Sequence, residues 1–360
     1  MPPAPVVHLL PYDVARGSQV YARAVCDLLD RDDDPHRIVT LFDGPPVLLR
    51  PDDTLGVTAG RLRTLGLDPR VLFRLGSWLH HRPVRAIVAH GGEAYKYAAL
   101  VAPRGLPIVY YRIGAVLPAA RRLPGRWWHA ALLRRAAMVA CVSDDVRVET
   151  QELFGVPKAR TAVIPNARDP AVYYPSPRQA RPVVSIGFVG QLMATKRPEW
   201  LLRAVATLRS EGIPVDGVLV GDGALAPDLN ARAPTAGVRY LGPSGDIPAV
   251  LRDLDVLLLP STLQEGMPGI IIEAALSGLP VVATDVPGVR DVISPEETGI
   301  IVGADDLDAA IDALRRLAID REMRDRMGRA ARIRCEERFS LGSSADAWRR
   351  LLGEVSPLRC

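Results

Sequence analysis

The 360-residue chain is poor in lysine and nearly neutral overall, and these two features exclude one class of partner. Three of its 45 basic residues are lysine, and the other 42 are arginines spread among 41 acidic residues. Proteins that bind nucleic acid usually concentrate basic charge on one face or tail. The even spread and the net charge of +4 therefore argue against a nucleic-acid partner and indicate an arginine-rich coding bias.

Cysteine and long apolar runs are also scarce. The four cysteines (Cys26, Cys141, Cys335 and Cys360) lie far apart without a C-x-x-C pair, which argues against a zinc site and a disulfide scaffold. No uncharged apolar stretch reaches the length of about 18 residues that spans a bilayer. The N-terminus lacks the basic region of a signal peptide. We therefore expect a cytoplasmic protein.

One segment leaves peripheral membrane contact open. Residues 118–137 combine several arginines with Trp127 and Trp128. Such a segment can lie on an anionic membrane or bind an acidic acceptor. The favoured interpretation is a helix that packs one side on the core and keeps its arginines in solvent.

The apolar content of 48% is enough for more than one core and predicts two domains. Short runs rich in β-branched residues alternate with helical patterns along the whole chain. Because such runs are typical of strands buried on both faces, they predict parallel sheets and an α/β fold of two doubly wound, Rossmann-like domains. The runs are 6–10, 36–42, 84–90, 107–111, 138–142, 161–165, 183–190, 215–221, 238–242, 255–260 and 280–284.

A proline-rich segment, 166–182, separates the two series of strands and is predicted to link the domains. The first domain then covers 1–175 and the second 183–340, with helical stretches at 305–318, 319–338 and 342–354. Ligands of such folds bind beyond the carboxyl ends of the strands. We therefore expect a site in a cleft between the domains, lined by the loops at 11–18, 90–93, 190–196, 221–223 and 265–270.

The segment 261–288 is the most informative part of the sequence. An apolar strand ends in a loop with Glu265, and a helix carrying Glu273 follows. The residues between them include two glycines that leave room for a ligand and a proline suited to a first helical turn: Gly266, Met267, Pro268, Gly269 and Ile270. The free N–H groups of a helix start favour an anion. Two carboxylates at either end of an anion cradle suit a diphosphate with a sugar on each side.

These residues resemble a known family. Glu265 and Glu273 match the E-x7-E motif of family-4 retaining glycosyltransferases, whose fold is called GT-B. Further segments resemble that family's signatures in the same order along the chain: RGSQVYA (16–22), AVIPNARDPAVYYP (162–175), GFVGQLMATK (187–196), VLVGDG (218–223), VRYLG (238–242) and LLLPST (257–262). In relatives of this fold the terminal helices cross back, which implies that 341–360 packs on the first domain.

The resemblance implies a role for each matching position. Glu273 would hold the ribose of a nucleotide, Glu265 the transferred sugar, and Lys196 the diphosphate as it leaves. An ammonium beside a departing diphosphate stabilises charge where it develops. The remaining donor-binding positions are Gly17, Ser18, Gly190, Gln191, Arg197, Gly221, Gly242, Gly266, Met267, Pro268, Gly269 and Ile270.

Two positions depart from the family pattern. Gln191 stands where the family usually has arginine, and Arg197 beside Lys196 could compensate. Ile113 stands where many members have a histidine that faces the reacting sugar. His90, at the end of a strand and followed by two glycines, is a candidate replacement or a hydrogen-bonded structural histidine. Arg112 could contact the donor phosphate or an acidic acceptor, or form a buried ion pair.

The sequence thus predicts a retaining glycosyltransferase that moves a sugar from a nucleotide diphosphate, with UDP favoured over GDP, to an acceptor hydroxyl. The product would be a natural-product or cell-envelope glycoside. By resemblance the leaving diphosphate helps to deprotonate the acceptor, so neither a metal nor another cofactor is expected. Alternatives are a sugar-nucleotide epimerase or hydrolase on the same fold and a non-catalytic sugar-nucleotide scaffold. The chain is expected to be a monomer or a homodimer.

Overall fold

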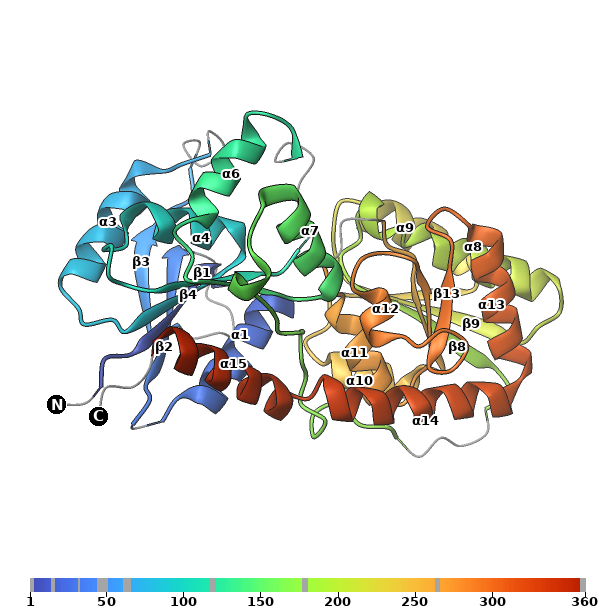
Figure 1. Cartoon of the computed structure of the whole chain (residues 1–360). Helices are drawn as coiled ribbons and strands as arrows, with labels where there is room; N and C mark the ends of the chain where they lie inside the picture. The colour runs from blue at the N-terminus through green and yellow to red at the C-terminus, as the bar shows by residue number, and fades with distance from the viewer. Residues whose placement is uncertain are drawn as a thin grey trace. The chain divides into compact units, whose positions relative to one another are not determined.

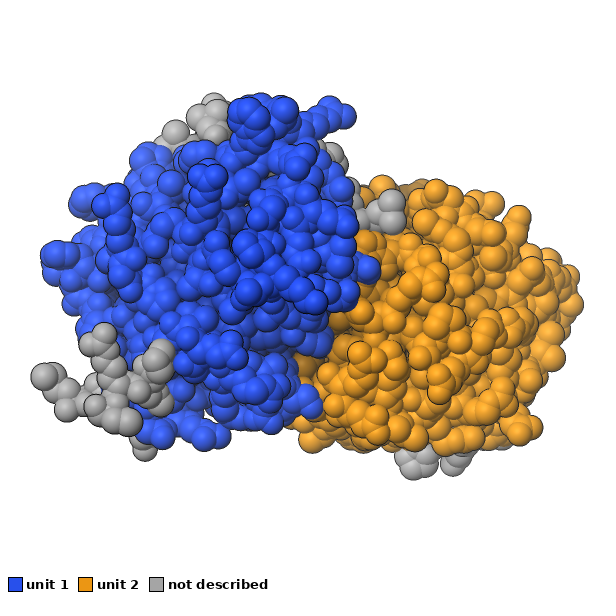
Figure 2. Space-filling view, in the orientation of Figure 1, with its two compact units in different colours: residues 1–166, 341–360 blue, residues 167–340 orange. Residues whose placement is uncertain are grey.

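The computed structural model describes residues 3–13, 17–31, 33–43, 51–60, 66–114, 116, 121–176, 181–262 and 266–356. The chain forms two compact units, shown in different colours in Figure 2. Unit 1 combines residues 1–166 with 341–360, and unit 2 is the continuous stretch 167–340.

Unit 1 contains a parallel sheet of seven described strands in the order β3-β2-β1-β4-β5-β6-β7. The chain builds the sheet outward from β1 to β3 and then continues from β4 on the other side of β1. The strands are β1 (Val6–Tyr12), β2 (His36–Phe42), β3 (Asp53–Val57), β4 (Ala86–His90), β5 (Ile108–Arg112), β6 (Met138–Cys141) and β7 (Thr161–Val163).

Helices lie on both sides of this sheet, with α1 and α15 on one side and α3, α4 and α6 on the other (Figure 1). Local signals in the sequence set several helix ends. Asp68 accepts a hydrogen bond from the Arg70 N–H at 3.0 Å and begins α3, and Gly155 ends α7 with φ 68°. The elements are α1 (Gly17–Leu29), α3 (Pro69–His80), α4 (Gly91–Val101), α6 (Gly125–Leu133), α7 (Asp144–Phe154), η1 (Lys158–Arg160) and α15 (Leu341–Val355).

Unit 2 contains a second parallel sheet, with six described strands in the order β10-β9-β8-β11-β12-β13. The strands are β8 (Val184–Val189), β9 (Val215–Val220), β10 (Val238–Gly242), β11 (Val256–Leu259), β12 (Val281–Thr284) and β13 (Gly299–Val302). Its helices are α8 (Glu199–Ser210), α9 (Ala226–Arg232), α10 (Ile247–Asp253), α11 (Gly269–Leu276), α12 (Val289–Val292), α13 (Leu307–Ile319) and α14 (Arg321–Arg338), with short turns η2 (Ala194–Lys196) and η3 (Pro234–Ala236). Phe188, Leu201 and Leu314 are fully or almost fully buried in its core. The α/β prediction of two doubly wound domains is confirmed.

Two strands escape the sequence prediction. β3 is an edge strand whose sequence, DTLGV, alternates between partly exposed and buried residues and has no continuous apolar run. β13 is an edge strand of the sheet in unit 2 and has only four residues. The predicted runs form the interior strands of both sheets and the edge strands β7 and β10. A continuous apolar run indicates a strand that is buried on both faces, which favours the prediction of interior strands.

The order of strands reverses once in each sheet. In unit 1 the reversal lies between β1 and β4, and in unit 2 it lies between β8 and β11. The loops after neighbouring strands turn to opposite sides at such a point, which opens a crevice at the carboxyl edge of the sheet. Each unit therefore has one position at which a ligand is expected.

No helix within the described ranges combines the length and apolar character needed to cross a membrane. The same parts of the chain hold no group of three or more His, Cys, Asp or Glu side chains arranged to bind a metal ion.

Candidate functional site

In unit 2 the two loops at the reversal are joined through the backbone. The Thr262 N–H donates to the Thr195 carbonyl at 2.8 Å, so the residue before Lys196 contacts the segment that follows β11. Glu265 itself, with residues 263 and 264, lies outside the described residues. Thr262, at the end of the described segment after β11, therefore lies beside the loop that carries Lys196.

Glycines allow the loops after β8 and β9 to approach each other. Gly221 has φ 140°, and a Cβ at this position would lie 1.8 Å from the Gly190 carbonyl oxygen. The Gly190 N–H donates to Val220 O at 3.0 Å, and the Gly221 N–H donates to Gly242 O at 2.9 Å. The three predicted glycines therefore lie together at the carboxyl edge of unit 2, where their lack of side chains lets the backbones pack.

The start of α11 forms the next part of the site. Pro268 precedes the helix, and no side chain caps it. Met267 is buried, while Gly269 and Ile270 are half-buried. Gly266 packs against Gly288, where an added Cβ would lie 2.2 Å from the Gly266 carbonyl oxygen. The first turn of α11 therefore presents main-chain N–H groups at an edge of the sheet, as anion binding requires.

Glu273 lies about one turn into α11, and its side chain is 12% exposed. Its carboxylate accepts a hydrogen bond from Arg168 Nε at 2.6 Å. This arginine was not among the predicted site residues, because nothing in the spacing of two residues so far apart in the chain announces the pair.

The two predicted cations, Lys196 and Arg197, and the polar residue Gln191 have different surroundings. Burial lowers the pKa of Lys196 to about 8. Arg197 adopts a left-handed conformation with φ 47°, and its guanidinium binds the Ala304 carbonyl and the Asp305 carboxylate. Gln191 is exposed. Because the pKa of Lys196 is close to neutral pH, the binding of an anion beside it can change the fraction of this side chain that is protonated.

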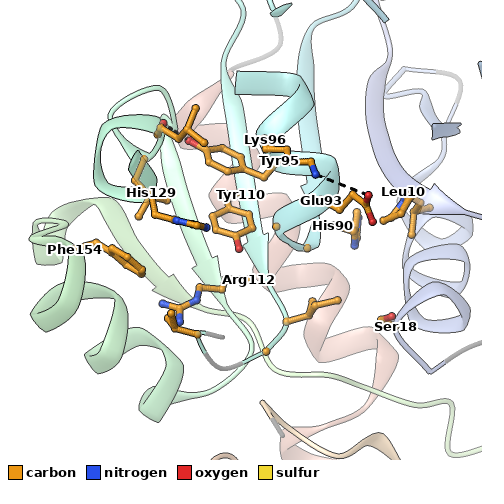
Figure 3. A pocket seen from close by; sticks show the side chains of 18 of the residues that line it. Leu10, Ser18, His90, Glu93, Tyr95, Lys96, Tyr110, Arg112, His129 and Phe154 are labelled. Atoms are coloured by element: carbon orange, nitrogen blue, oxygen red, sulfur yellow. Dashed lines mark hydrogen bonds and ion pairs between the residues drawn. The ribbon is translucent and has the colours of Figure 1, made fainter. Parts of the chain in front are cut away.

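Unit 1 has a cavity of about 920 Å³ at its reversal point, drawn in Figure 3. It lies where β1, β4 and β5 end, and residues of α4 and α6 complete its wall. Two of the predicted catalytic residues, His90 and Arg112, line it together with Ser18. Gly17, the other predicted glycine-loop position, is exposed at the first residue of α1.

Several aromatic side chains line this cavity. The rings of Tyr95 and Tyr110 stack with centroids 4.3 Å apart, and those of His129 and Phe154 stack at 5.9 Å. Trp128 lines the cavity and is half exposed. Aromatic walls with a few polar groups are typical of pockets for small organic ligands.

The charged groups of the cavity are paired. Arg112 is 4% exposed, and its guanidinium binds the Glu149 carboxylate and the Thr150 hydroxyl. Glu149 also binds Arg121, so this carboxylate holds two arginines. Near the opposite wall Lys96 Nζ lies 3.9 Å from Glu93 Oε1 (Figure 3).

His90 ends a chain of three buried histidines. His90 Nε2 lies 3.0 Å from His8 Nδ1, and His8 Nε2 lies 2.9 Å from His36 Nδ1. Burial lowers the pKa of His90 to about 3 and that of His36 to about 4, although Asp34 opposes the latter shift. All three imidazoles are therefore neutral at pH 7. The sequence shows a histidine in each of three runs that are predicted as buried strands. It does not show the strand order that brings these three histidines into contact.

Ile113, at the position of the family's histidine, lies over Gly91. A Cβ on Gly91 would be 3.5 Å from the Ile113 Cδ1, so an apolar contact occupies this part of the cavity wall.

Two family models match successive parts of the chain. The model described as Glycosyltransferase Family 4 matches residues 15–172, and the model described as Glycosyl transferases group 1 matches residues 184–320. The chain belongs to the family-4 glycosyltransferases.

Curated members of this family are similar to parts of the chain. A 2-deoxystreptamine glucosyltransferase of Streptomyces kanamyceticus is 33% identical over 180 residues, which are 45% of this chain and 46% of that protein. An Escherichia coli galactosyltransferase named for UDP-Gal and α-D-GlcNAc-diphosphoundecaprenol is 28% identical over 240 residues, 60% of this chain and 62% of its own. The chain thus spans between about half and three fifths of the lengths of these relatives.

Solved structures match almost the whole family-4 chain. HepE of Anabaena in complex with UDP-glucose has a TM-score of 0.80 at 19% identity, covering 97% of this chain and 99% of that one. Sucrose-phosphate synthase of Thermosynechococcus elongatus has a TM-score of 0.81 at 17% identity, covering 98% of both. The fold is therefore GT-B, as the sequence predicts.

Proposed function

We propose that the chain is a retaining glycosyltransferase that moves a sugar from a nucleotide diphosphate sugar to an acceptor hydroxyl, with UDP as the favoured nucleotide. The observation that carries the proposal is the grouping in unit 2 of the glycine loops, the Lys196 loop and the start of α11 at one reversal point. A diphosphate there meets main-chain N–H groups and an ammonium. Glu273 is near enough along α11 to receive the ribose hydroxyls.

Each further residue has one task in this reaction. Glu265 binds hydroxyls of the transferred sugar, and Lys196 stabilises the negative charge that develops on the diphosphate. The bond between the anomeric carbon and the diphosphate oxygen breaks, and the acceptor oxygen bonds to the same face of the sugar. The acceptor proton passes to the leaving diphosphate. Because the charge is balanced by Lys196 and N–H groups, no metal ion is required, and chelation with EDTA should leave activity unchanged.

The acceptor binds in the cavity of unit 1. Its volume of about 920 Å³ suits a molecule larger than one sugar ring, and its aromatic walls suit an acceptor with an apolar part. A hydroxylated natural product and a cell-envelope precursor both fit this description. The names of the two curated relatives give 2-deoxystreptamine and α-D-GlcNAc-diphosphoundecaprenol as their acceptors.

A panel of nucleotide sugars tests the donor site. UDP-glucose, UDP-galactose, UDP-N-acetylglucosamine and GDP-mannose are added in turn to the wild type, to Glu273→Ala and to Glu322→Ala, which changes an exposed carboxylate of α14 as a control. We expect one donor to raise the melting temperature of the wild type and the control but not of Glu273→Ala. Stabilisation that survives in Glu273→Ala would contradict its ribose role.

Release of the nucleotide diphosphate then separates the reaction classes. A transferase releases it at a rate that depends on an added acceptor alcohol. Free sugar or an isomeric donor formed without an acceptor would indicate a hydrolase or an epimerase. If a donor stabilises the protein but no nucleotide diphosphate, free sugar or isomeric donor forms, the catalytic proposal fails and the role of a non-catalytic sugar-nucleotide scaffold remains.

A further inference from the structure

Arg168 is fixed in unit 2 by its backbone and its side chain. Its N–H donates to the Phe339 carbonyl at 3.0 Å, and Nη1 donates to the Ala167 carbonyl at 2.9 Å. Nε donates to Glu273 Oε1 at 2.6 Å, with side chains 5% and 12% exposed. A guanidinium anchored at several points in a buried place has little freedom, so the carboxylate bonded to it is oriented as well.

The guanidinium also fills the space beside the start of α11. A Cβ on Gly269 would lie 2.3 Å from Arg168 Nη2 and 3.1 Å from its Cζ. The absence of a side chain at Gly269 therefore leaves room for the guanidinium of Arg168.

The half-buried side chain of Tyr173 interacts with both members of the Arg168–Glu273 pair. The pKa of Tyr173 is raised to about 12, first by burial and then by the charge of Glu273, while Arg168 acts in the opposite direction. Tyr173 therefore stays protonated and adds no charge. The positive charge of Arg168 cancels that of Glu273, so a diphosphate at the start of α11 meets no uncompensated carboxylate on that helix.

We propose that Arg168 is a positioning residue that holds the Glu273 carboxylate in the orientation that accepts hydrogen bonds from the ribose hydroxyls. The proposal rests on the role given to Glu273 under the proposed function. One oxygen of the carboxylate is bonded to Arg168 Nε, and the other is presented to the nucleotide. Without the arginine the carboxylate is free to rotate. The site then no longer binds a nucleotide that has its ribose hydroxyls more tightly than one that lacks them.

The test compares UDP with 2′,3′-dideoxy-UDP, which lacks both ribose hydroxyls, by isothermal titration. If the donor panel selects GDP, the corresponding guanosine pair is used. We expect the wild type to bind UDP at least about tenfold more tightly, as hydrogen bonds to a charged group predict. In Arg168→Met the ratio should fall to about two, while the affinity for the dideoxy nucleotide changes by less than about threefold.

Two further variants keep the test decisive if Arg168→Met does not fold. Arg168→Lys retains the charge without the fixed planar fork and should give an intermediate ratio. Gly269→Ala displaces the guanidinium and should lower the ratio with Arg168 still present. Arg316→Met is the matched control, because it breaks an exposed guanidinium–carboxylate pair with Glu296 on the same unit.

The outcomes separate this inference from the proposed function. A wild type that binds neither nucleotide overturns the proposed function and this role together. A wild type that binds both nucleotides equally overturns the ribose role of Glu273 and with it the role of Arg168, but donor binding stands. If the wild type discriminates and the Arg168 and Gly269 variants discriminate equally well, or weaken both nucleotides alike, Arg168 is structural only.

Discussion

His8 and His90 hold each other in the sheet of unit 1, with His8 Nδ1 and His90 Nε2 3.0 Å apart. The strands that carry them, β1 and β4, are neighbours at the reversal of strand order. Trp348 of α15 packs edge-on against His8 and lies tilted beside His90. A neutral pair in an apolar layer has consequences for stability that depend on pH.

The three histidines should destabilise the protein as the pH falls. Burial lowers the pKa of His8, His36 and His90, and neighbouring Asp34, Asp30, Arg85 and Arg23 modify it for the first two. The unfolded chain then binds protons below about pH 6.5, whereas the folded protein does not until its lower pKa values are reached. Their stabilising contribution is complete above about pH 6.5 and falls by about 2 kcal/mol per histidine at pH 5.

Urea unfolding at pH 7, 6 and 5 measures this loss. His36→Gln should reduce the dependence of the unfolding free energy on pH by about one histidine's share. Exposed His81→Gln is the control and should leave the slope unchanged. A free energy that does not change between pH 7 and 5 would disprove neutral burial of the cluster.

Lys196 should give the activity an alkaline limit. Because its pKa is lowered to about 8, the free protein loses the ammonium as the pH rises through that value. We expect kcat/KM to fall above about pH 8, since this ratio reports the pKa of the free protein. Lys196→Arg keeps its charge and should remove that limb from the profile.

Lys196→Ala should lower kcat by about 100-fold and donor affinity by less than about tenfold, because the ammonium acts on charge that develops in the transition state. Equal losses in both quantities would instead assign it to ground-state binding.

Trp128 and Trp127 offer a matched pair for the acceptor cavity. Trp128 lines the cavity, and Trp127, next to it on α6, is more exposed and is not among the described lining residues. Trp128→Ala should raise the acceptor KM by about fivefold or more, while the dissociation constant of the donor stays unchanged. Trp127→Ala should leave both constants as they are. Equal effects of the two substitutions would argue against the cavity as the acceptor site.

His90→Ala should lower turnover by at least about tenfold if its imidazole contacts the reacting groups. His8→Gln is the comparison, because His8 touches His90 without appearing among the lining residues of the cavity. Turnover of His90→Ala within a few-fold of the wild type would leave His90 with a structural role.

The sequence predicts the fold better than the contacts within it. Interior strands can be predicted from the sequence because burial on both faces requires apolar runs. The edge strand β3 has no such run and could not be predicted in this way. The glycine loops and Glu273 could be predicted as site residues because they lie in short segments that resemble the family's motifs. The Arg168–Glu273 pair joins residues 105 positions apart, and the histidine chain joins three strands whose order in the sheet differs from that in the sequence. Such contacts exist only once the topology is known.

Unit 1 is built from two segments that lie far apart in the sequence, 1–166 and 341–360. It therefore cannot complete its fold until the second segment has been synthesised. Trp348 is fully buried, and its indole N–H donates at 2.9 Å to the Tyr21 hydroxyl, which is itself 2.6 Å from the Ser344 hydroxyl. Until α15 has been translated, the α1 face around Tyr21 lacks this cover, although all seven described strands of its sheet have already been synthesised. Unit 2 is continuous and can fold earlier. A premature stop before α15 would therefore release a chain whose defect lies in its first half, exposed to proteases and to aggregation.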